Sequence, residues 1–458
     1  MSSLAPQRIP TDYTQGSVIS AIVKMGLPSM FGFLSENIYR FVDTFWVSRL
    51  ENGEAAVAAI TFFGTMQWMM FSFNSLVGPG SVAVISRRYG EKAYDRAEKA
   101  IKETIILKLF FGAVLGTAGY LFVRMILGLL GAEGEALEMG VTYGQTMLLG
   151  LPVMFATYSI FTGMRSVANP QMAMMLMVGS NLLNLVLDPL FIFGYAGLPA
   201  LGIQGAAVAS VTSFLITLSV GFVLFYGRRT NVRLTLSGEA PISLQSMLKI
   251  VKIGVPAWLG ELSFSGSRLV ITPMIAAFGT PVVAAYGVGN QVTHFGIMVL
   301  VGIGLGLSSL IGHTVGSGKI DRARTVGNTA VWLGIGIMAF FGIVTFAFAP
   351  QIMRLFFQDA ETVTYGVHML RILALGFPFL GGFLMMEEIH MGVGLNTPTM
   401  IMAIIHGWIL QALPMYILTQ VMGFNQDAIW WAASGSLFLG CVIFYQYYRR
   451  GRWLTHQV

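Results

Sequence analysis

The sequence predicts an all-α membrane protein in which twelve transmembrane helices form two pseudo-symmetric six-helix lobes around a central cleft. Hydrophobic residues make up 55% of its 458 positions and charged residues only 10%, whereas about a quarter of the residues in a soluble globular chain are charged. Apolar runs recur from one end to the other, and in lipid only helices satisfy their own backbone groups without closing a barrel. The composition therefore leaves no room for a sizeable soluble domain.

Twelve apolar runs meet the length of about 20 residues that one crossing needs. In chain order they lie near residues 17–49, 54–86, 100–130, 139–163, 170–195, 202–227, 247–279, 281–312, 325–352, 362–389, 398–422 and 427–449. An even number of spans places both ends of the chain on the same side of the membrane.

The positive charges are distributed as a topology signal rather than as a nucleic-acid-binding patch. The formal net charge is +6, and Lys and Arg gather after span 2, between spans 6 and 7, after span 8 and at the end of the chain. By the positive-inside rule we expect a multi-pass protein of the cell membrane with both termini cytoplasmic and no nucleic-acid partner. The single cysteine, Cys441, excludes an internal disulfide framework, and the first apolar run is too long and too charged for a cleaved signal peptide.

The second half of the chain repeats the first at an offset of 222 to 228 residues. "IVKMGLP" returns as "IVKIGVP", "YGEKAYDRA" as "VGSGKIDRA", and "VTYG" occurs in both halves. We therefore expect an N-lobe at 1–228, a cytoplasmic interlobe loop at 229–246 and a C-lobe at 247–458. Parallel repeats that meet at a midplane cleft suit alternating access by a transporter, although a duplicated bundle could also be purely structural. No Walker-type phosphate-binding sequence is present, so ATP is not the expected energy source.

Span 5 contains polar residues that the second half of the chain lacks at the aligned positions. When the halves are aligned on Pro189 and Pro414, Asp188 falls on Leu413. Asn184 lies one helical turn before Asp188 and so shares its face. A charged carboxylate at the bilayer centre costs about 2.5 to 3.5 kcal/mol on insertion scales, so it normally faces a cavity and has a function. The alternative is a protonated acid that bonds to carbonyls freed by Pro189.

Span 1 shows the same asymmetry. When it is aligned with span 7, Arg40 matches Arg268, but Asp43 falls on Ile271. Glu36, Arg40 and Asp43 form one stripe, and Arg40 could simply neutralise Asp43. Two acids in one lobe can instead take up a proton or coordinate Na⁺ with nearby oxygens.

The side chains proposed to complete such a cation-coupling site carry hydroxyl or amide oxygens. They are Asn184, Tyr143 and Ser210. A Na⁺ ion would use Asp43, Asp188, Asn184 and Ser210. In the second half, Glu261 and Arg268 lie seven residues apart on span 7, and we expect them to stabilise one another, although both could line the cleft.

Four segments resemble the multidrug and toxic compound extrusion (MATE) transporters, particularly the DinF-like branch, over essentially the whole chain. They are "VDTFWVSRL", "ISRRYGEKAYDRA", "MRSVANPQM" and "NLVLDPLFIFGYAGLPALGIQGAAVAS". The resemblance implies an exporter of amphiphilic, often cationic compounds driven by inward flow of H⁺ or Na⁺, with no other cofactor. It assigns the acidic pocket to Asp43, Tyr143, Asn184 and Asp188, and a helix bend to Pro28.

This chain departs from the family pattern at three places. Ser210 stands where the family usually has Thr, and Glu36 where an uncharged residue is expected. The second-half carboxylates of the NorM-like branch are replaced by Phe264 and by a glycine-rich segment around Gly381. The first half must therefore carry the coupling, with a substrate cleft at Glu36, Arg40, Asp43, Tyr143 and Asp188.

Three other functions compete with this interpretation. A lipid or lipid-linked oligosaccharide flippase would share the scaffold, but its anionic substrates favour a cleft lined by Arg. An intramembrane aspartyl protease needs a GxGD-type context that both acids lack. A channel is the third. We expect a monomeric, non-enzymatic carrier whose partners are the lipid bilayer and small amphiphilic or cationic substrates.

Overall fold

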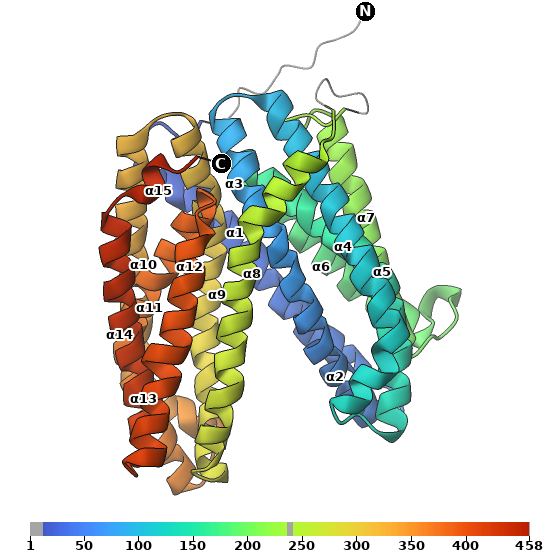
Figure 1. Cartoon of the computed structure of the whole chain (residues 1–458). Helices are drawn as coiled ribbons and strands as arrows, with labels where there is room; N and C mark the ends of the chain where they lie inside the picture. Colours follow the sequence, from blue (N-terminus) through green and yellow to red (C-terminus); the bar gives the residue numbers. More distant parts are fainter. Residues whose placement is uncertain (1–11, 236–240, 458) are drawn as a thin grey trace, which may run out of the picture. The chain divides into compact units, whose positions relative to one another are not determined.

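The computed structural model describes residues 12–235 and 241–457, and over these ranges the chain forms helices and no strand. Packing divides it into two compact units. Unit 1 is formed mainly by Leu27–Gly254, and unit 2 by Thr14–Gly26 and Val255–Val458. In Figure 1 most of unit 1 is coloured from blue to green, and most of unit 2 from yellow to red. The interlobe loop expected at 229–246 remains a prediction, and its residues 236–240 lie outside the described ranges.

Unit 1 contains the helices of the first six spans. They are α1 (Val18–Val47, of which the part from Leu27 belongs here), α2 (Gly53–Ser72), η1 (Phe73–Leu76), α3 (Gly78–Gly90), α4 (Tyr94–Leu129), α5 (Gly134–Ser166), α6 (Pro170–Phe193), η2 (Tyr195–Gly197) and α7 (Ile203–Tyr226). Two sequence signals bound α6: Pro170 occupies its first turn, and Gly194 ends it in the left-handed conformation at φ 74°.

Glycines let α4 approach α5 closely. A Cβ on Gly112 would lie 2.6 Å from Cα of Pro152, and one on Gly116 would lie 2.4 Å from the carbonyl oxygen of Leu148. Small residues at four-residue spacing are the usual means of close helix packing in membranes.

Unit 2 repeats this arrangement. Its helices are the later part of α8 (Leu244–Ala276), α9 (Thr280–Gly316), α10 (Ile320–Phe356), α11 (Ala360–Gly392), α12 (Asn396–Ile404), η3 (Ile405–Ala412), α13 (Leu413–Tyr416), η4 (Ile417–Val421), α14 (Asp427–Arg449) and α15 (Arg452–Thr455). A Cβ on Gly381 of α11 would lie 2.2 Å from the carbonyl oxygen of Gly334 on α10. The turns η3 and η4 are π-helical, whereas the corresponding helix of unit 1, α6, is α-helical throughout.

The predicted spans are confirmed to within a few residues at each end. In the described part of the chain, eleven helices are long and apolar enough to cross a membrane. The twelfth, α8, has 33 residues but carries four charged side chains, including Glu261 and Arg268, which lower its hydropathy.

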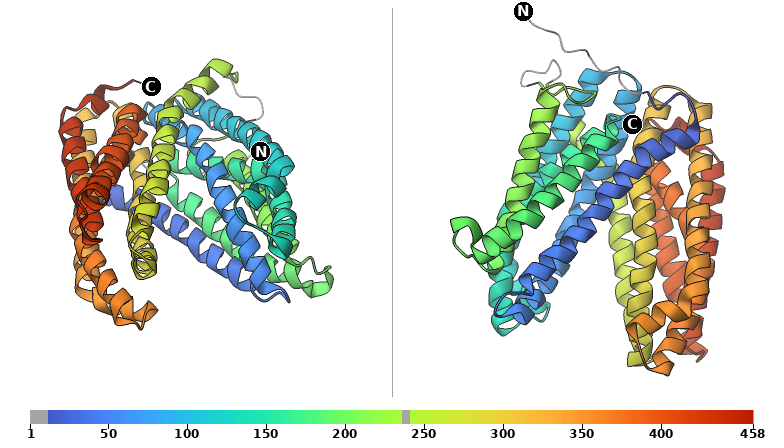
Figure 2. Two further views of the ribbon diagram at one scale, coloured as in Figure 1. Left: turned by 60° about the horizontal axis from the view of Figure 1, so that its bottom comes forward. Right: turned by 180° about the vertical axis from the view of Figure 1, so that it is seen from behind.

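The helix α1 belongs to both units. Its beginning packs in unit 2, where Nζ of Lys319 donates to the carbonyl oxygen of Thr14 at 3.1 Å and to its hydroxyl at 2.7 Å. A Cβ on Gly306 would lie 2.3 Å from the carbonyl oxygen of Met25. The remainder packs in unit 1. Pro28 lies inside α1, which is drawn as one continuous helix in Figure 2.

The helix α8 makes the reciprocal exchange. The backbone N–H of Ser243, just before α8, donates to Oε1 of the fully buried Glu103 at 3.0 Å in unit 1. A Cβ on Gly254 would lie 2.0 Å from the carbonyl oxygen of Leu76. From Val255 onward, next to Pro256, the helix belongs to unit 2. Each unit therefore holds the first turns of the other unit's leading helix.

Candidate functional site

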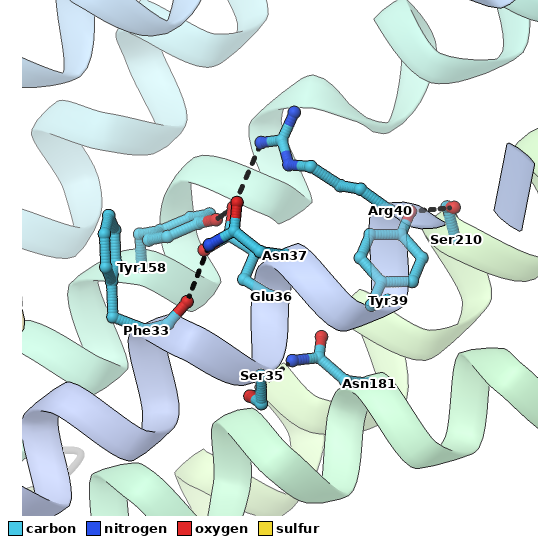
Figure 3. A network of polar contacts seen from close by, with 9 residues as sticks. All are labelled: Phe33, Ser35, Glu36, Asn37, Tyr39, Arg40, Tyr158, Asn181 and Ser210. Carbon is cyan, nitrogen blue, oxygen red and sulfur yellow. Dashed lines mark hydrogen bonds and ion pairs between the residues drawn. The ribbon is translucent and has the colours of Figure 1, made fainter. Parts of the chain in front are cut away.

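Three helices of unit 1 meet at the hydroxyl of Ser210. The Tyr39 hydroxyl of α1 lies 2.8 Å from Oγ of Ser210 on α7, and Nδ2 of Asn184 on α6 donates to the same atom at 3.3 Å. Figure 3 shows Tyr39 and Ser210 facing one another. Ser210 and Asn184 are buried, so these hydrogen bonds form away from bulk solvent.

The two aspartates lie beside this meeting point. Asp43 is 5% exposed and Asp188 is fully buried, and their carboxylates interact electrostatically. On α6 the buried positions Ser180, Asn184 and Asp188 recur every four residues, which places Asp188 on the inward face.

Several buried oxygens at this site lack a well-formed hydrogen bond. Oδ1 of Asp43 and Oδ1 of Asn184 have no partner among the described residues. The carboxylate of Asp188 has the Asn184 side chain beside it, at a looser geometry than a regular hydrogen bond. Buried acceptors without a donor are rare in folded proteins and call for an explanation. A bound proton or a hard cation, which prefers oxygen ligands, would satisfy them.

The side chains present limit which atoms could ligate a cation. Within the described ranges, no group of three or more His, Cys, Asp and Glu side chains could hold a metal ion. A cation would therefore use amide and hydroxyl oxygens, from Asn184 and Ser210, in addition to the two carboxylates.

Tyr143 also reaches this region. It is 4% exposed, its ring packs edge-on against Phe63 at 5.3 Å, and its hydroxyl lies within electrostatic range of Asp43, Tyr39 and Asp188. The structure thus brings Tyr143 together with the sequence-predicted Asp43, Asp188, Asn184 and Ser210 inside unit 1.

Arg40 forms its ion pair with Glu36, although its charge also acts on Asp43 at longer range. Its Nη2 lies 3.1 Å from Oε1 of Glu36, one turn earlier on α1, and the Tyr158 hydroxyl of α5 donates to the same oxygen at 2.8 Å (Figure 3). Tyr39 and Tyr158 were not among the sequence-based candidates. The spacing of Glu36, Tyr39 and Asp43, at i, i+3 and i+7, could have indicated Tyr39.

The expected pairing of Glu261 with Arg268 stays a prediction, but the structure gives Arg268 a nearer partner. The guanidinium of Arg268 lies over the ring of Phe264 at 4.9 Å. Phe264 is one helical turn from Arg268, whereas Glu261 is about 10 Å away along the axis, at seven residues of rise. The cation–π contact is therefore the nearer one.

Comparisons with known proteins agree with the duplicated fold. A chain titled as an outward-facing multidrug resistance MATE family transporter superposes with a TM-score of 0.87 at 23% identity, covering 98% of this chain and 99% of that one. A transporter of the MOP superfamily from Pyrococcus furiosus gives the same TM-score and identity over 99% of this chain and 100% of that one. These likenesses confirm the fold of twelve helices in two lobes.

Among curated relatives, a probable multidrug resistance protein of Bacillus subtilis, YoeA, is 25% identical over 87% of this chain and 86% of its own. A protein of Shewanella oneidensis named FAD transporter is 28% identical over 75% of each chain. The profile of the MatE family matches twice, at residues 28–190 and 256–417, so each match begins at the proline where a leading helix changes unit. The chain belongs to the MatE family.

Proposed function

We propose that this protein is an antiporter that exports amphiphilic, often cationic compounds by alternating access, coupled to inward flow of H⁺ or Na⁺ through the carboxylates of unit 1. Family membership makes it a multi-pass membrane transporter and not an enzyme. The names of its relatives, which include multidrug export proteins of Staphylococcus, support drug export.

The observation that carries the coupling is the set of buried oxygens on Asp43, Asp188 and Asn184 that lack a well-formed hydrogen bond. The second half of the chain has Ile271 and Leu413 in place of the two acids. Loading a proton or Na⁺ would neutralise the repulsion between the carboxylates and draw the Asn184 and Ser210 oxygens toward the ion. Asp43 is itself on α1, and Ser210 contacts Tyr39 of the same helix, so loading would act on α1 at two positions.

The setting of this activity is part of the proposal. The protein acts as a monomer in the cell membrane with both termini cytoplasmic, and H⁺ or Na⁺ is its only cofactor. Pro28 would allow α1 to bend where it passes between the units.

Proteoliposomes loaded with ethidium and given an imposed pH or Na⁺ gradient test this function. We expect wild-type protein to drive ethidium against its gradient, and Asp43→Asn and Asp188→Asn to lose at least about tenfold of this rate, because each removes a charge that loading requires. Glu54→Gln, an exposed position in the first turn of α2, is the control and keeps the wild-type rate. Gradient-driven transport at the wild-type rate by both aspartate variants would refute the assignment.

Export of an anionic flavin nucleotide is a second candidate. It is favoured by two cations buried in unit 1, Lys108 at 1% and Arg165 at 6% exposure. The repeat places Gly334 opposite Lys108, so this cation too is private to the first half. Counterflow of FAD that is lost in Lys108→Met would support this candidate, and an absence of FAD counterflow in the wild type would exclude it.

A further inference from the structure

A small pocket in unit 1 combines one carboxylate with four aromatic rings. Glu36 lines it together with Tyr39, Tyr158, Phe161 and Phe214. The rings form a continuous cluster, because Tyr158 packs against Phe161 at 5.8 Å and against Phe214 at 6.2 Å. The pocket is open on one side, and its free interior holds about one water molecule. Only the head group of a ligand can therefore enter, with its body against the rings at the opening.

The carboxylate of Glu36 already has a cation. Its Oε1 accepts hydrogen bonds from Arg40 at 3.1 Å and from Tyr158 at 2.8 Å. The Glu36 side chain is 16% exposed, whereas the Arg40 side chain is 56% exposed. The acid is thus fixed in the pocket wall, and the guanidinium is the more exposed and less restrained partner of the pair.

The internal repeat separates the roles of the two residues. Arg40 corresponds to Arg268, but Glu36 corresponds to Phe264. The arginine is therefore common to both halves, whereas the carboxylate occurs only in the first half. In unit 2 the arginine lies on the phenyl ring, and no equivalent ion pair exists between these two positions.

We propose that the Glu36–Arg40 pair is a recognition site for zwitterionic aromatic compounds, in which the ligand ammonium binds Glu36 and the ligand carboxylate binds Arg40. This assignment rests on the proposed export function, since it names a substrate class for unit 1. The aromatic body lies against Tyr158 and Phe214, whose faces also attract the ammonium.

Charge pairing distinguishes this class from simple cations. A monocation that takes the place of the guanidinium leaves Arg40 unpaired, and an anion leaves Glu36 competing with the ligand for the same guanidinium. A zwitterion inserted between the two leaves every charge paired, and Arg40 presents two parallel donors to a carboxylate.

Three matched probes test the inference by equilibrium dialysis of radiolabelled ligand against purified protein in detergent. They are 4-(aminomethyl)benzoate as the zwitterion, its methyl ester as the cation and its N-acetyl derivative as the anion. We expect the zwitterion to bind wild-type protein about two- to fivefold more tightly than the ester, the gain of one partly exposed ion pair. The anion binds most weakly.

The variants make the test specific. Arg40→Gln reverses the order, so that the ester binds at least as tightly as the zwitterion, and Glu36→Gln weakens both by about tenfold, as loss of a hydrogen bond to a charged group predicts. Arg268→Gln, the matched arginine of the other half, leaves the order unchanged. Equal binding of zwitterion and ester to the wild type, an unchanged order in Arg40→Gln, or no binding of any probe would overturn the inference.

This assay uses no ion gradient, so its result is independent of coupling. If Asp188→Asn still transports at the wild-type rate, the proposed coupling fails while the binding result stands. If the probe order is not as expected, the Glu36 assignment fails while the coupling result stands.

Discussion

At the scale of single residues, Tyr39 connects two parts of unit 1. Its ring lines the pocket that contains Glu36, and its hydroxyl lies 2.8 Å from Ser210, which also accepts from Asn184. A substrate that moves the ring therefore changes the hydrogen bonding beside Asp188. We regard Tyr39 as a positioning residue, because it acts on the carboxylate through Ser210 and Asn184.

Tyr39→Phe keeps the ring and removes this hydrogen bond. We expect binding of 4-(aminomethyl)benzoate within about twofold of wild type, but a shift of about two- to tenfold in the ion concentration that half-saturates transport, the range for one lost hydrogen bond. The measurement is the ion dependence of ethidium transport in proteoliposomes. Tyr120→Phe, a partly exposed tyrosine of α4, is the control, and an unchanged ion dependence in Tyr39→Phe would contradict the role.

Part of this site could be predicted from sequence, and the reason is the repeat. Asp43 and Asp188 were identifiable because the second half has apolar residues in their place. The pairing of Arg40 with Glu36 was not identifiable, because Asp43 lies at an equally favourable spacing on the other side of Arg40. Tyr39 and Tyr158 gave little signal, since tyrosines in apolar helices are ordinary packing residues.

At the scale of elements, close helix packing depends on glycines whose missing side chain is required. In the α4–α5 pair a Cβ on Gly116 would lie 2.4 Å from the backbone carbonyl oxygen of Leu148. A Cβ on Gly128 of the same helix would have no atom within 4 Å. Backbone cannot rotate away as a flexible side chain can. The two positions are therefore expected to respond to alanine in opposite directions.

Gly116→Ala should destabilise the protein by about 1 to 3 kcal/mol through overpacking. Gly128→Ala should leave stability unchanged or raise it by up to about 1 kcal/mol, because alanine is the better helix former. Thermal unfolding in detergent measures both, as a lower midpoint for the first and an equal or higher one for the second. A midpoint for Gly116→Ala at or above that of Gly128→Ala would show that the helices separate without penalty.

The start of α11 supplies a pH-dependent element outside the spans. The Asp359 carboxylate accepts the backbone N–H of Thr362 at 2.8 Å as the N-cap of this helix. Hydrogen bonds from the Thr362 side chain and backbone lower the pKa of Asp359 below its usual value of 3.8. A lowered pKa in the folded state means that the cap stabilises the helix above the unfolded pKa and is lost as pH falls through the folded one.

We therefore expect hydrogen exchange of the Thr362 amide, compared with an intrinsic rate at each pH, to lose protection as pH falls below about 4. Asp359→Asn, which also caps helices, should keep protection at neutral pH and remove the pH dependence. Asp359→Ala should lose protection at every pH. Retained protection in Asp359→Ala would exclude the cap as its source.

The boundaries of the helices were predictable, but their internal geometry was not. Length and hydropathy predicted most of the spans, and the match of α8 to α1 in the internal repeat supported the one that carries more charge. The π-helical turns at Ile405–Ala412 and Ile417–Val421 left no such trace, since an almost uniformly apolar stretch does not reveal whether its period is 3.6 residues or slightly longer.

At the scale of the whole molecule, the duplication is combined with an exchange of helix starts. A contiguous division of the chain assigns all of α1 to the first half, yet its first turns pack in unit 2, and those of α8 pack in unit 1. Sequence similarity between the halves could not show this, because both halves repeat the same "IVK" segment whichever unit it packs in. Pro28 and Pro256 lie next to the residues at which α1 and α8 change from one unit to the other.

The central claim is that one unit of a symmetric scaffold carries the coupling charge. Glu387→Gln provides a control for it, as an acid of α11 in unit 2. Asp188 belongs to unit 1 and Glu387 to unit 2. Comparing their variants therefore tests whether coupling is confined to unit 1, and not whether the protein needs acidic residues in general.

The most direct measurement places an ethidium gradient, and no ion gradient, across proteoliposomes and records internal pH or Na⁺. Wild-type protein and Glu387→Gln should move the ion against the direction of ethidium flow, and Asp188→Asn should move none. Ion movement that persists in Asp188→Asn, or that disappears in Glu387→Gln, would contradict the assignment of coupling to unit 1.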